Sequence, residues 1–254
     1  MIYYAIADLH GRYDLLELAF KTIKEHIGSK GCSDYKIITL GDYIDRGPDS
    51  KEIIESLMDS TDNLICLQGN HEAMMVETIR TPLDPEWWIS NGGDATLKSY
   101  GSIMMPMRID HYSTQYLDYD PHVIDQEHVE WISNLPLYYE TEKQVFVHAG
   151  LPLSNRYGAA DLEEQSKYKA GHGGLAMQWM LYGKDDPGGH EDKHVVHGHH
   201  QFADGPHEWS GRTNLDTYAW RTGRLVVGVF DDTQGKAIRY LEVLGDDYAK
   251  DNPS

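Results

Sequence analysis

The 254-residue sequence contains few cysteines, and none of them has the setting of a catalytic thiol. Cys32 and Cys66 are too few for a disulfide framework or a cysteine-rich zinc site. A cysteine-dependent phosphatase needs an arginine six residues after its nucleophile, and these positions hold Ile38 and Glu72. Catalysis through a covalent thiol intermediate is therefore not expected.

Basic residues and long apolar runs are also scarce. Lysine and arginine number 22 against 41 aspartates and glutamates, which gives a formal charge of −19. This charge repels nucleic acids and anionic membranes, so we expect neither as a partner. No run approaches the roughly 20 apolar residues of a membrane span, and the first residues lack the basic and apolar regions of a signal peptide. We expect a cytoplasmic protein.

The sequence lacks internal repeats and low-complexity linkers that would mark a domain boundary. At this length one large α/β domain is possible, and we predict a single domain over residues 1–245. Residues 246–254 are expected to form a flexible C-terminal tail.

Apolar residues in the first half follow alternating strand and helix patterns, which favour a sheet with helices packed on its faces. The expected strands cover residues 2–7, 36–40 and 64–67, and the expected helices cover 13–27, 49–58, 72–79, 84–100 and 125–134. The second half is richer in strands and predicts a second sheet. Its strands are expected at 144–147, 194–196, 225–230 and 236–243, and residues 183–193, rich in Gly and Pro, are expected to form an exposed loop.

Polar residues follow five of the expected strands, at the position where open α/β sheets bind their ligands. Each of the five segments places Asp, Asn or His beside Gly. The segments are Asp8-Leu9-His10-Gly11, Gly41-Asp42-Tyr43-Ile44-Asp45-Arg46-Gly47, Gly69-Asn70-His71-Glu72, His148-Ala149-Gly150 and Gly198-His199.

These residue types are the ligands that divalent metals prefer. Carboxylate, amide oxygen and imidazole groups bind Mn²⁺, Fe²⁺ and Zn²⁺, and glycine lets the backbone turn sharply beside the ion. One such segment alone would be an ordinary turn, since Asp, Asn and Gly are common in turns and an isolated histidine is usually a surface group. Five in order, each at a strand end, indicate a metal site.

At these segments the sequence resembles the calcineurin-like metallophosphoesterases, and within them the PPP family of phosphoprotein phosphatases of the bacterial and phage (lambda phosphatase-like) type. Residues 88–93 and Leu135-Pro136-Leu137 add to this resemblance. The resemblance implies an α/β fold in which two mixed sheets form a β-sandwich flanked by helices, in four layers α/β/β/α. It also implies a metal-dependent hydrolase of phosphate monoesters that uses a bridging hydroxide.

The same resemblance assigns the metal ligands. It implies two divalent metal ions per chain, one bound by Asp8 and His10 and the other by three further residues, with Asp42 as the bridge between them. The three ligands of the second ion are Asn70, His148 and His199. A carboxylate is the side chain that can share its charge between two cations. Mn²⁺ is the expected metal, and Fe and Zn²⁺ accept the same ligands.

The resemblance gives catalytic roles to His71, Asp45 and Arg46. His71 would protonate the leaving group while Asp45 orients it, because a carboxylate partner favours the protonated imidazole. Arg46 would bind two phosphoryl oxygens with its planar fork. Arg46, Asn70 and His71 are thus the expected substrate-binding residues.

The sequence departs from the family pattern in a few positions. Bacterial relatives carry Trp-x-Arg before the final Gly-His, where this sequence has Leu181. Either another cation replaces that arginine, with Arg156 and Lys184 as candidates, or the phosphoryl group is held more weakly. Relatives also favour Asp-Thr-Gly where this sequence has Asp216-Thr217-Tyr218. Two interpretations of Tyr218 are open, a residue that lines the site or an ordinary packed aromatic residue, and we favour the second.

The most favoured function is a phosphoprotein phosphatase for Ser/Thr and possible Tyr sites. The first alternative is a diadenosine-tetraphosphate hydrolase or other small-molecule phosphoesterase, which shares the metal core. The second is a catalytically silent scaffold of the same fold, which the retained ligands argue against. The sequence leaves the oligomeric state open.

Overall fold

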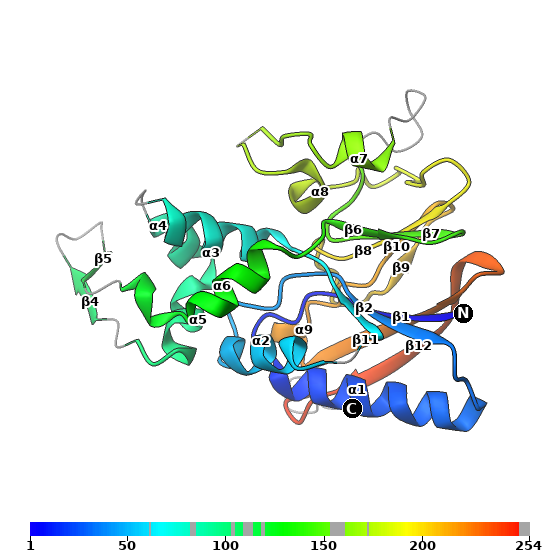
Figure 1. The fold of residues 1–254 in the computed structure, drawn as a ribbon, viewed down its shortest axis with the longest axis horizontal. Coiled ribbons are helices and arrows are strands. Elements are labelled where there is room, and N and C mark those ends of the chain that lie inside the picture. Colours follow the sequence, from blue (N-terminus) through cyan, green and yellow to red (C-terminus); the bar gives the residue numbers. More distant parts are fainter. Residues whose placement is uncertain are drawn as a thin grey trace.

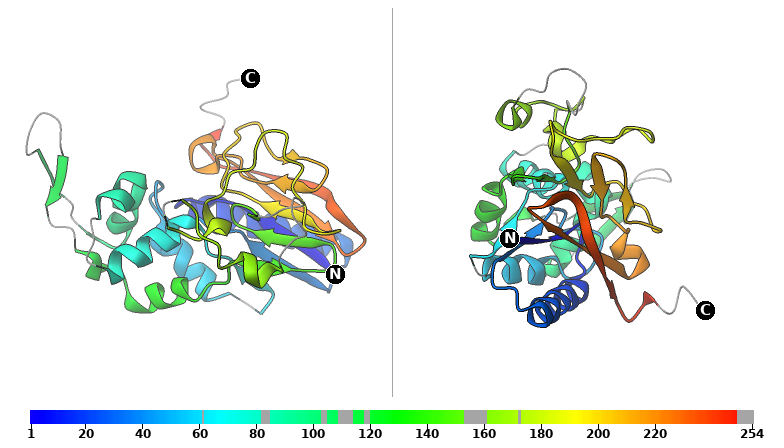
Figure 2. Two further views of the ribbon diagram at one scale, coloured as in Figure 1. Left: turned by 90° about the horizontal axis from the view of Figure 1, so that it is seen from above. Right: turned by 90° about the vertical axis from the view of Figure 1, so that its right-hand side faces the viewer.

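The computed structural model describes residues 1–60, 62–81, 85–102, 105–108, 114–117, 120–152, 161–171 and 173–248. Two five-stranded sheets face each other, and helices cover their outer faces (Figure 1). Figure 2 shows the same stacking from two further sides. The predicted sandwich of two mixed sheets flanked by helices is confirmed.

The first sheet joins the N-terminal strands to the C-terminal hairpin. Strands β1, β2 and β3 are parallel, whereas β11 runs antiparallel to both β1 and β12. The sheet order is β12 (Gln234–Leu244), β11 (Arg224–Asp231), β1 (Ile2–Ile6), β2 (Tyr35–Thr39) and β3 (Leu64–Cys66). The carboxyl ends of β1, β2 and β3 therefore reach the same edge.

The second sheet is built from the second half of the chain. Strands β7, β8 and β10 are parallel, while β6 and β9 are antiparallel edges. The order is β6 (Tyr138–Glu140), β7 (Gln144–Val147), β8 (His194–His197), β10 (Arg212–Asn214) and β9 (His207–Glu208). A separate two-stranded sheet consists of β4 (Met105–Arg108) and β5 (Thr114–Leu117).

The helices form the outer layers. One group packs on the first sheet, and α7 and α8 lie over the second (Figure 1). The first group contains α1 (Tyr13–Lys30), α2 (Ser50–Met58), α3 (Asn70–Arg80) and α6 (Gln126–Ser133), and the second contains α7 (Leu162–Gln165) and α8 (Ala176–Trp179). Further short elements are α4 (Glu86–Trp88), the π-helix η1 (Ile89–Gly93), α5 (Asp94–Ser99), the 3₁₀-helix η2 (Pro121–Val123) and α9 (Ala219–Thr222).

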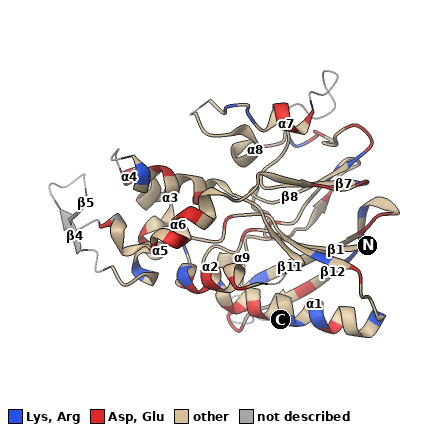
Figure 3. Cartoon of the chain, in the orientation of Figure 1, with Lys and Arg blue, Asp and Glu red and all other residues tan. Residues whose placement is uncertain are grey.

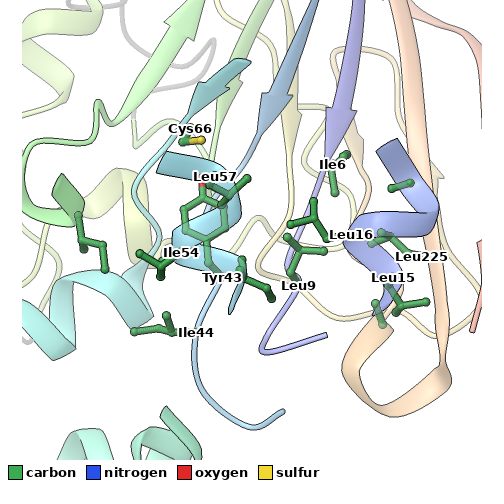
Figure 4. Close-up of a cluster of buried hydrophobic side chains, with 14 of the residues drawn as sticks. Ile6, Leu9, Leu15, Leu16, Tyr43, Ile44, Ile54, Leu57, Cys66 and Leu225 are labelled. Atoms are coloured by element: carbon green, nitrogen blue, oxygen red, sulfur yellow. The ribbon is translucent and has the colours of Figure 1, made fainter. Parts of the chain in front are cut away.

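Alternating side chains of the strands separate two hydrophobic cores. In β1, Tyr3 and Ala5 face the second sheet and pack with Phe146, whereas Tyr4 and Ile6 face the helices. Figure 4 shows part of the helix-facing core around Ile6 and Tyr43. Complete burial of such a side chain contributes about 1.5–3 kcal/mol, so both faces of the first sheet are fixed and its strand ends are held in place.

The expected helix over residues 84–100 is wrong as a single element. The chain instead forms α4, η1 and α5, with a break at Gly92, where φ is 108°. A Cβ atom at Gly92 would lie 2.8 Å from the Arg46 backbone nitrogen, and Arg46 N–H donates to Gly92 O at 3.1 Å. The break thus allows the loop after β2 to approach this segment.

The expected exposed loop over residues 183–193 is partly wrong. It contains no helix or strand, as predicted, but Gly188, Gly189 and His190 are buried. The reason is that Gly188 packs against the Arg212 side chain, which a Cβ atom would approach to 2.6 Å. The Gly and Pro content predicted the irregular backbone and not this contact.

Acidic residues lie on helices α1, α2, α6 and α7, on the outer layers of the molecule (Figure 3). None of the helices in the described part of the chain has the length and apolar character required to cross a bilayer.

Of the expected C-terminal tail, residues 246–248 are described, and Asp247 pairs with Arg12 at 2.9 Å. Residues 249–254 lie outside the described residues.

Candidate metal and active site

The predicted ligands come together where the strands of both sheets end. Asp8 follows β1, Asp42 follows β2 and Asn70 begins α3 directly after β3, while His148 and His199 follow β7 and β8. All but His199 are buried, with 3% or less of each residue exposed. The sequence order of the five segments therefore becomes one cluster in space.

Asp42 lies at the centre of this cluster. Its Oδ2 atom is 3.5 Å from His10 Nε2, and its Oδ1 atom is 3.4 Å from His148 Nε2. Oδ1 also accepts the N–H group of His71 at 3.1 Å. One carboxylate thus presents separate oxygens to two histidines from different sheets, as a bridging ligand would.

The rings of His10 and His148 are oriented by backbone carbonyl groups. His10 Nδ1 pairs with Ile44 O, and His148 Nδ1 pairs with Leu40 O, both at 2.9 Å. With hydrogens on the Nδ1 atoms, the lone pairs of both Nε2 atoms face the cluster. Burial, as the main cause, lowers the pKa of both histidines and favours the neutral ligand form. Such backbone bonds are typical of histidines that bind metals.

The remaining predicted ligands lie on either side of His148 and Asp42. Asn70 Oδ1 is 2.9 Å and His199 Nδ1 is 3.3 Å from His148 Nε2. The Asp8 carboxylate accepts the backbone N–H of His199 at 3.0 Å. The structure thus brings all six predicted metal ligands into one cluster.

The donor atoms fit divalent cations. Two groups, His10 with Asp42 and His71, and Asp42 with His148 and His199, each have ligand atoms within 4.8 Å of one another. The first group contains His71 where the resemblance implies Asp8. Burial, followed by the Asp8 and Glu72 charges, raises the pKa of Asp42 well above its usual range. A cation would offset this accumulation of buried negative charge.

His71 is held by Asp45 at the first turn of α3. Its Nδ1 atom lies 2.6 Å from Asp45 Oδ2, so Nε2 is directed toward the cluster. Asp45 in turn accepts hydrogen bonds from Trp88 Nε1 at 2.9 Å and from Thr96 Oγ1 at 2.6 Å. These two hydrogen bonds fix the Asp45 carboxylate beside the His71 ring.

Arg46 extends over the same cluster. Its Nη1 atom is 2.6 Å from His10 Nε2, and its Nη2 atom is 3.0 Å from His71 Nε2. The guanidinium also stacks on Trp220, 5.7 Å from the ring centroid. Its planar fork is therefore within reach of a phosphoryl group bound at the cluster.

The loops of the cluster hold strained backbone conformations. Of the seven non-glycine residues with positive φ in the described ranges, five are predicted site residues. Their φ values run from 44° to 73°, and they are His10, Asp42, Asp45, Arg46 and His199. Each such conformation costs on the order of 1–3 kcal/mol and persists only where the surroundings enforce it, which is typical of functional sites.

Glu72 is a site residue whose role the sequence did not reveal. Its buried carboxylate accepts N–H groups from Asp42 and Tyr43, both at 2.8 Å, and from Gly69 at 2.9 Å. Burial raises its pKa to about 7, although these three bonds oppose the shift. Glu72 thus ties the loop after β2 to the loop after β3. Its place in Gly-Asn-His-Glu was the available signal.

Of the two predicted substitutes for the missing arginine, the structure describes Lys184 alone, and none of the described contacts joins Lys184 to the cluster. Leu181 is 60% exposed. Lys184 is also exposed, and its backbone oxygen accepts a hydrogen bond from Trp209. Arg156 lies outside the described residues. Arg46 is therefore the cation that the structure places beside the predicted ligands.

Comparison with known proteins identifies the family of the chain. The family model "Calcineurin-like phosphoesterase" matches residues 1–230. A zinc-dependent endopolyphosphatase of Saccharomyces cerevisiae is 34% identical over 86 residues, 34% of this chain and 25% of that protein. Serine/threonine-protein phosphatase 2 of Escherichia coli K12 is 34% identical over 91 residues, 36% of this chain and 38% of that protein. The chain thus spans about a quarter to two-fifths of the length of these curated relatives.

A solved structure has the same fold. The protein serine/threonine phosphatase from Saccharomyces cerevisiae superposes with a TM-score of 0.59 and 13% identity, over 96% of this chain and 80% of that one. At this identity the likeness concerns the fold alone. The cluster described above occupies the strand ends of that shared fold.

Proposed function

The chain belongs to the calcineurin-like phosphoesterase family, and we propose that it hydrolyses phosphate monoesters of phosphoproteins with the help of two divalent cations. The observation that carries this proposal is the position of Asp42 between His10 and His148, with one carboxylate oxygen toward each. A shared carboxylate flanked by neutral imidazoles is suited to a pair of cations.

We assign the two cation sites by combining the resemblance with the geometry. Asp8 and His10 would hold one cation, Asp42 would bridge, and the second would be held by Asn70, His148 and His199. When bound, the cations supply a hydroxide nucleophile near neutral pH and offset negative charge on the phosphoryl group. Mn²⁺ is the proposed metal, because the oxygen and imidazole ligands suit it.

His71 would donate the proton that the leaving oxygen needs. Asp45 holds Nδ1 at 2.6 Å, so the ring presents Nε2 to the cluster. The Nε2 atom is then the position from which a proton would be donated to the leaving oxygen. Asp45 is a positioning residue in this scheme, and Trp88 and Thr96 keep it in place.

Arg46 and Asn70 would bind the phosphoryl group. The Arg46 fork is held by Trp220 on one side and lies beside His10 and His71 on the other. A bidentate contact orients the phosphorus for attack, and charge-assisted hydrogen bonds of this kind contribute about 1.5–3 kcal/mol.

Similarity to the E. coli serine/threonine phosphatase supports a phosphoprotein substrate.

The two free cysteines fit a reducing compartment, and we therefore place the reaction in the cytoplasm. Similarity to the yeast endopolyphosphatase supports a second candidate, the hydrolysis of the phosphoanhydride bonds of polyphosphate. Diadenosine tetraphosphate, the alternative that the sequence left open, contains bonds of the same kind. Both reactions would use the same cluster.

A substrate panel with Mn²⁺ distinguishes these candidates. We expect a phosphoserine peptide to be hydrolysed with a kcat/KM at least about tenfold higher than that of diadenosine tetraphosphate or polyphosphate, a difference of about 1.4 kcal/mol in transition-state binding. The measurement is phosphate release under identical conditions. A preference for either anhydride would replace the phosphoprotein assignment while retaining the metal-dependent mechanism.

A further inference from the structure

One more carboxylate reaches the edge where the metal ligands gather. Strand β10 runs parallel to β8 with Asn214 opposite His197, and Leu215 N–H donates to His197 O at 2.8 Å. Asp216 comes two residues after the end of β10, and His199 comes two residues after the end of β8. Asp216 therefore follows β10 as the predicted ligand His199 follows β8.

The two oxygens of Asp216 have different environments. Oδ1 accepts the N–H group of Tyr218 at 2.8 Å, which stabilises the turn into α9. Oδ2 is buried and receives no hydrogen bond from a donor group of the described residues, and the residue is only 2% exposed. The side-chain neighbour of Asp216 is the carboxyl group of Asp8. An unsatisfied buried polar atom costs about 1–3 kcal/mol, and more when it is charged. The turn into α9 explains the hydrogen bond of Oδ1, but it does not explain why Oδ2 is buried.

Asp216 adds to a concentration of negative charge around Asp8. The Asp216 side chain lies close to the Asp8 carboxylate, and the charge of Arg46 also acts on it. Asp42 is likewise buried within reach of the Asp8 charge. The carboxylates of Asp8, Asp42 and Asp216 are buried and repel one another. A bound divalent cation would offset this repulsion.

We propose that Asp216 belongs to the metal site at Asp8 and His10, where it supplies a second carboxylate that strengthens the binding of a divalent cation. This inference rests on the proposed function, because it assumes that the cluster binds metal. It extends the cluster to a sixth strand end, which neither the resemblance nor the ligand types in the five segments had assigned.

A charge-removing substitution separates this role from a structural role in the turn. Asp216→Asn keeps an oxygen that can accept the Tyr218 N–H, and asparagine is well tolerated in turns of this kind. If the turn were the only role, this variant would bind metal like the wild type. If Asp216 supports the cation, the variant loses affinity although its turn is preserved.

The test is calorimetric titration of metal-stripped protein with Mn²⁺ alone. We expect Asp216→Asn to bind Mn²⁺ about 10–100-fold more weakly at one of two sites, the range typical for residues that support metal ligands. Its melting temperature without metal should equal or exceed that of the wild type, because a repulsive charge is removed. The matched control is Asp231→Asn, since Asp231 Oδ1 accepts the N–H of Thr233 in a turn at the opposite end of β1.

The outcomes are distinct. Unchanged Mn²⁺ affinity at both sites in Asp216→Asn would overturn this inference and leave the proposed function standing. A wild-type protein that binds no Mn²⁺ would overturn both. If Asp216→Asn does not fold, as judged by circular dichroism, Asp216→Ser removes the same charge while retaining an acceptor for Tyr218 N–H, and the same criterion applies to it.

Discussion

Asp42→Asn is expected to weaken both metal sites together and to lower phosphatase activity by roughly 10³-fold or more, because several kcal/mol of charge stabilisation depend on the cations. The physical reason is geometric. The two oxygens of Asp42 face His10 and His148 separately, so a neutral amide in this position removes the shared charge from both. Metal content and phosphate release, measured on the same preparation, test this expectation.

The choice of asparagine keeps the rest of the loop intact. Asp42 has a φ of 55°, a conformation that asparagine tolerates better than most residues. The amide oxygen can still accept His71 N–H. Asp49→Asn, in the same loop but outside the cluster, is the matched control and should retain both metals. Two metals bound by Asp42→Asn with unchanged affinity would mean that Asp42 is not the bridge.

His71→Asn is expected to lower kcat by roughly 10²- to 10⁴-fold for a phosphoserine peptide, the range of general acid catalysis. The serine alkoxide is a poor leaving group and needs a proton. With p-nitrophenyl phosphate the loss should be much smaller, because that leaving group is stable as an anion. The ratio of the two losses, measured at saturating substrate, is the informative quantity.

The metal content of His71→Asn must accompany these rates, since His71 shares a group of ligand atoms with His10 and Asp42. We expect both metals to be retained. Asp45→Asn is the companion variant, and it should give the same dependence on the leaving group with a smaller loss, because it only orients His71. Equal losses on the two substrates, or loss of a metal, would assign His71 to binding instead of proton transfer.

Much of the fold could be predicted because the first half of the sequence is strongly periodic. The strand-to-helix units around β1 and β2 follow from apolar spacing and short polar turns, and the candidate ligands were assigned by the family resemblance of the segments at the strand ends. The helix after β3 was expected from residue 72, whereas α3 begins at Asn70. Asn70 and His71 therefore lie on the first helical turn, where the His71 N–H group donates to Asp42 Oδ1.

The remaining site features depend on contacts between distant segments. Asp45 is fixed by Trp88 and Thr96, which are 43 and 51 residues away in the sequence. No local pattern predicts such contacts. The break at Gly92 was missed because its neighbours continue a helical pattern, although φ is 108° where it meets Arg46.

Asp216 escaped prediction for a related reason. Strand β10 has only three residues, Arg-Thr-Asn, and lacks the apolar run that identifies a buried strand. The sequence comparison considered Tyr218, because this residue departs from the family pattern. It did not consider the Asp216 carboxylate, which lies close to Asp8. The pairing of β10 with β8, which brings Asp216 to the same sheet edge as His199, cannot be read from composition.

The central claim is that hydrolysis depends on metal held by the cluster around Asp42, and metal removal followed by reconstitution tests it most directly. After removal verified by elemental analysis, the protein should release no measurable phosphate from p-nitrophenyl phosphate, and added Mn²⁺ should restore the reaction. The same treatment of Asp42→Asn should restore little. Full activity of the wild-type protein after complete metal removal would contradict the account.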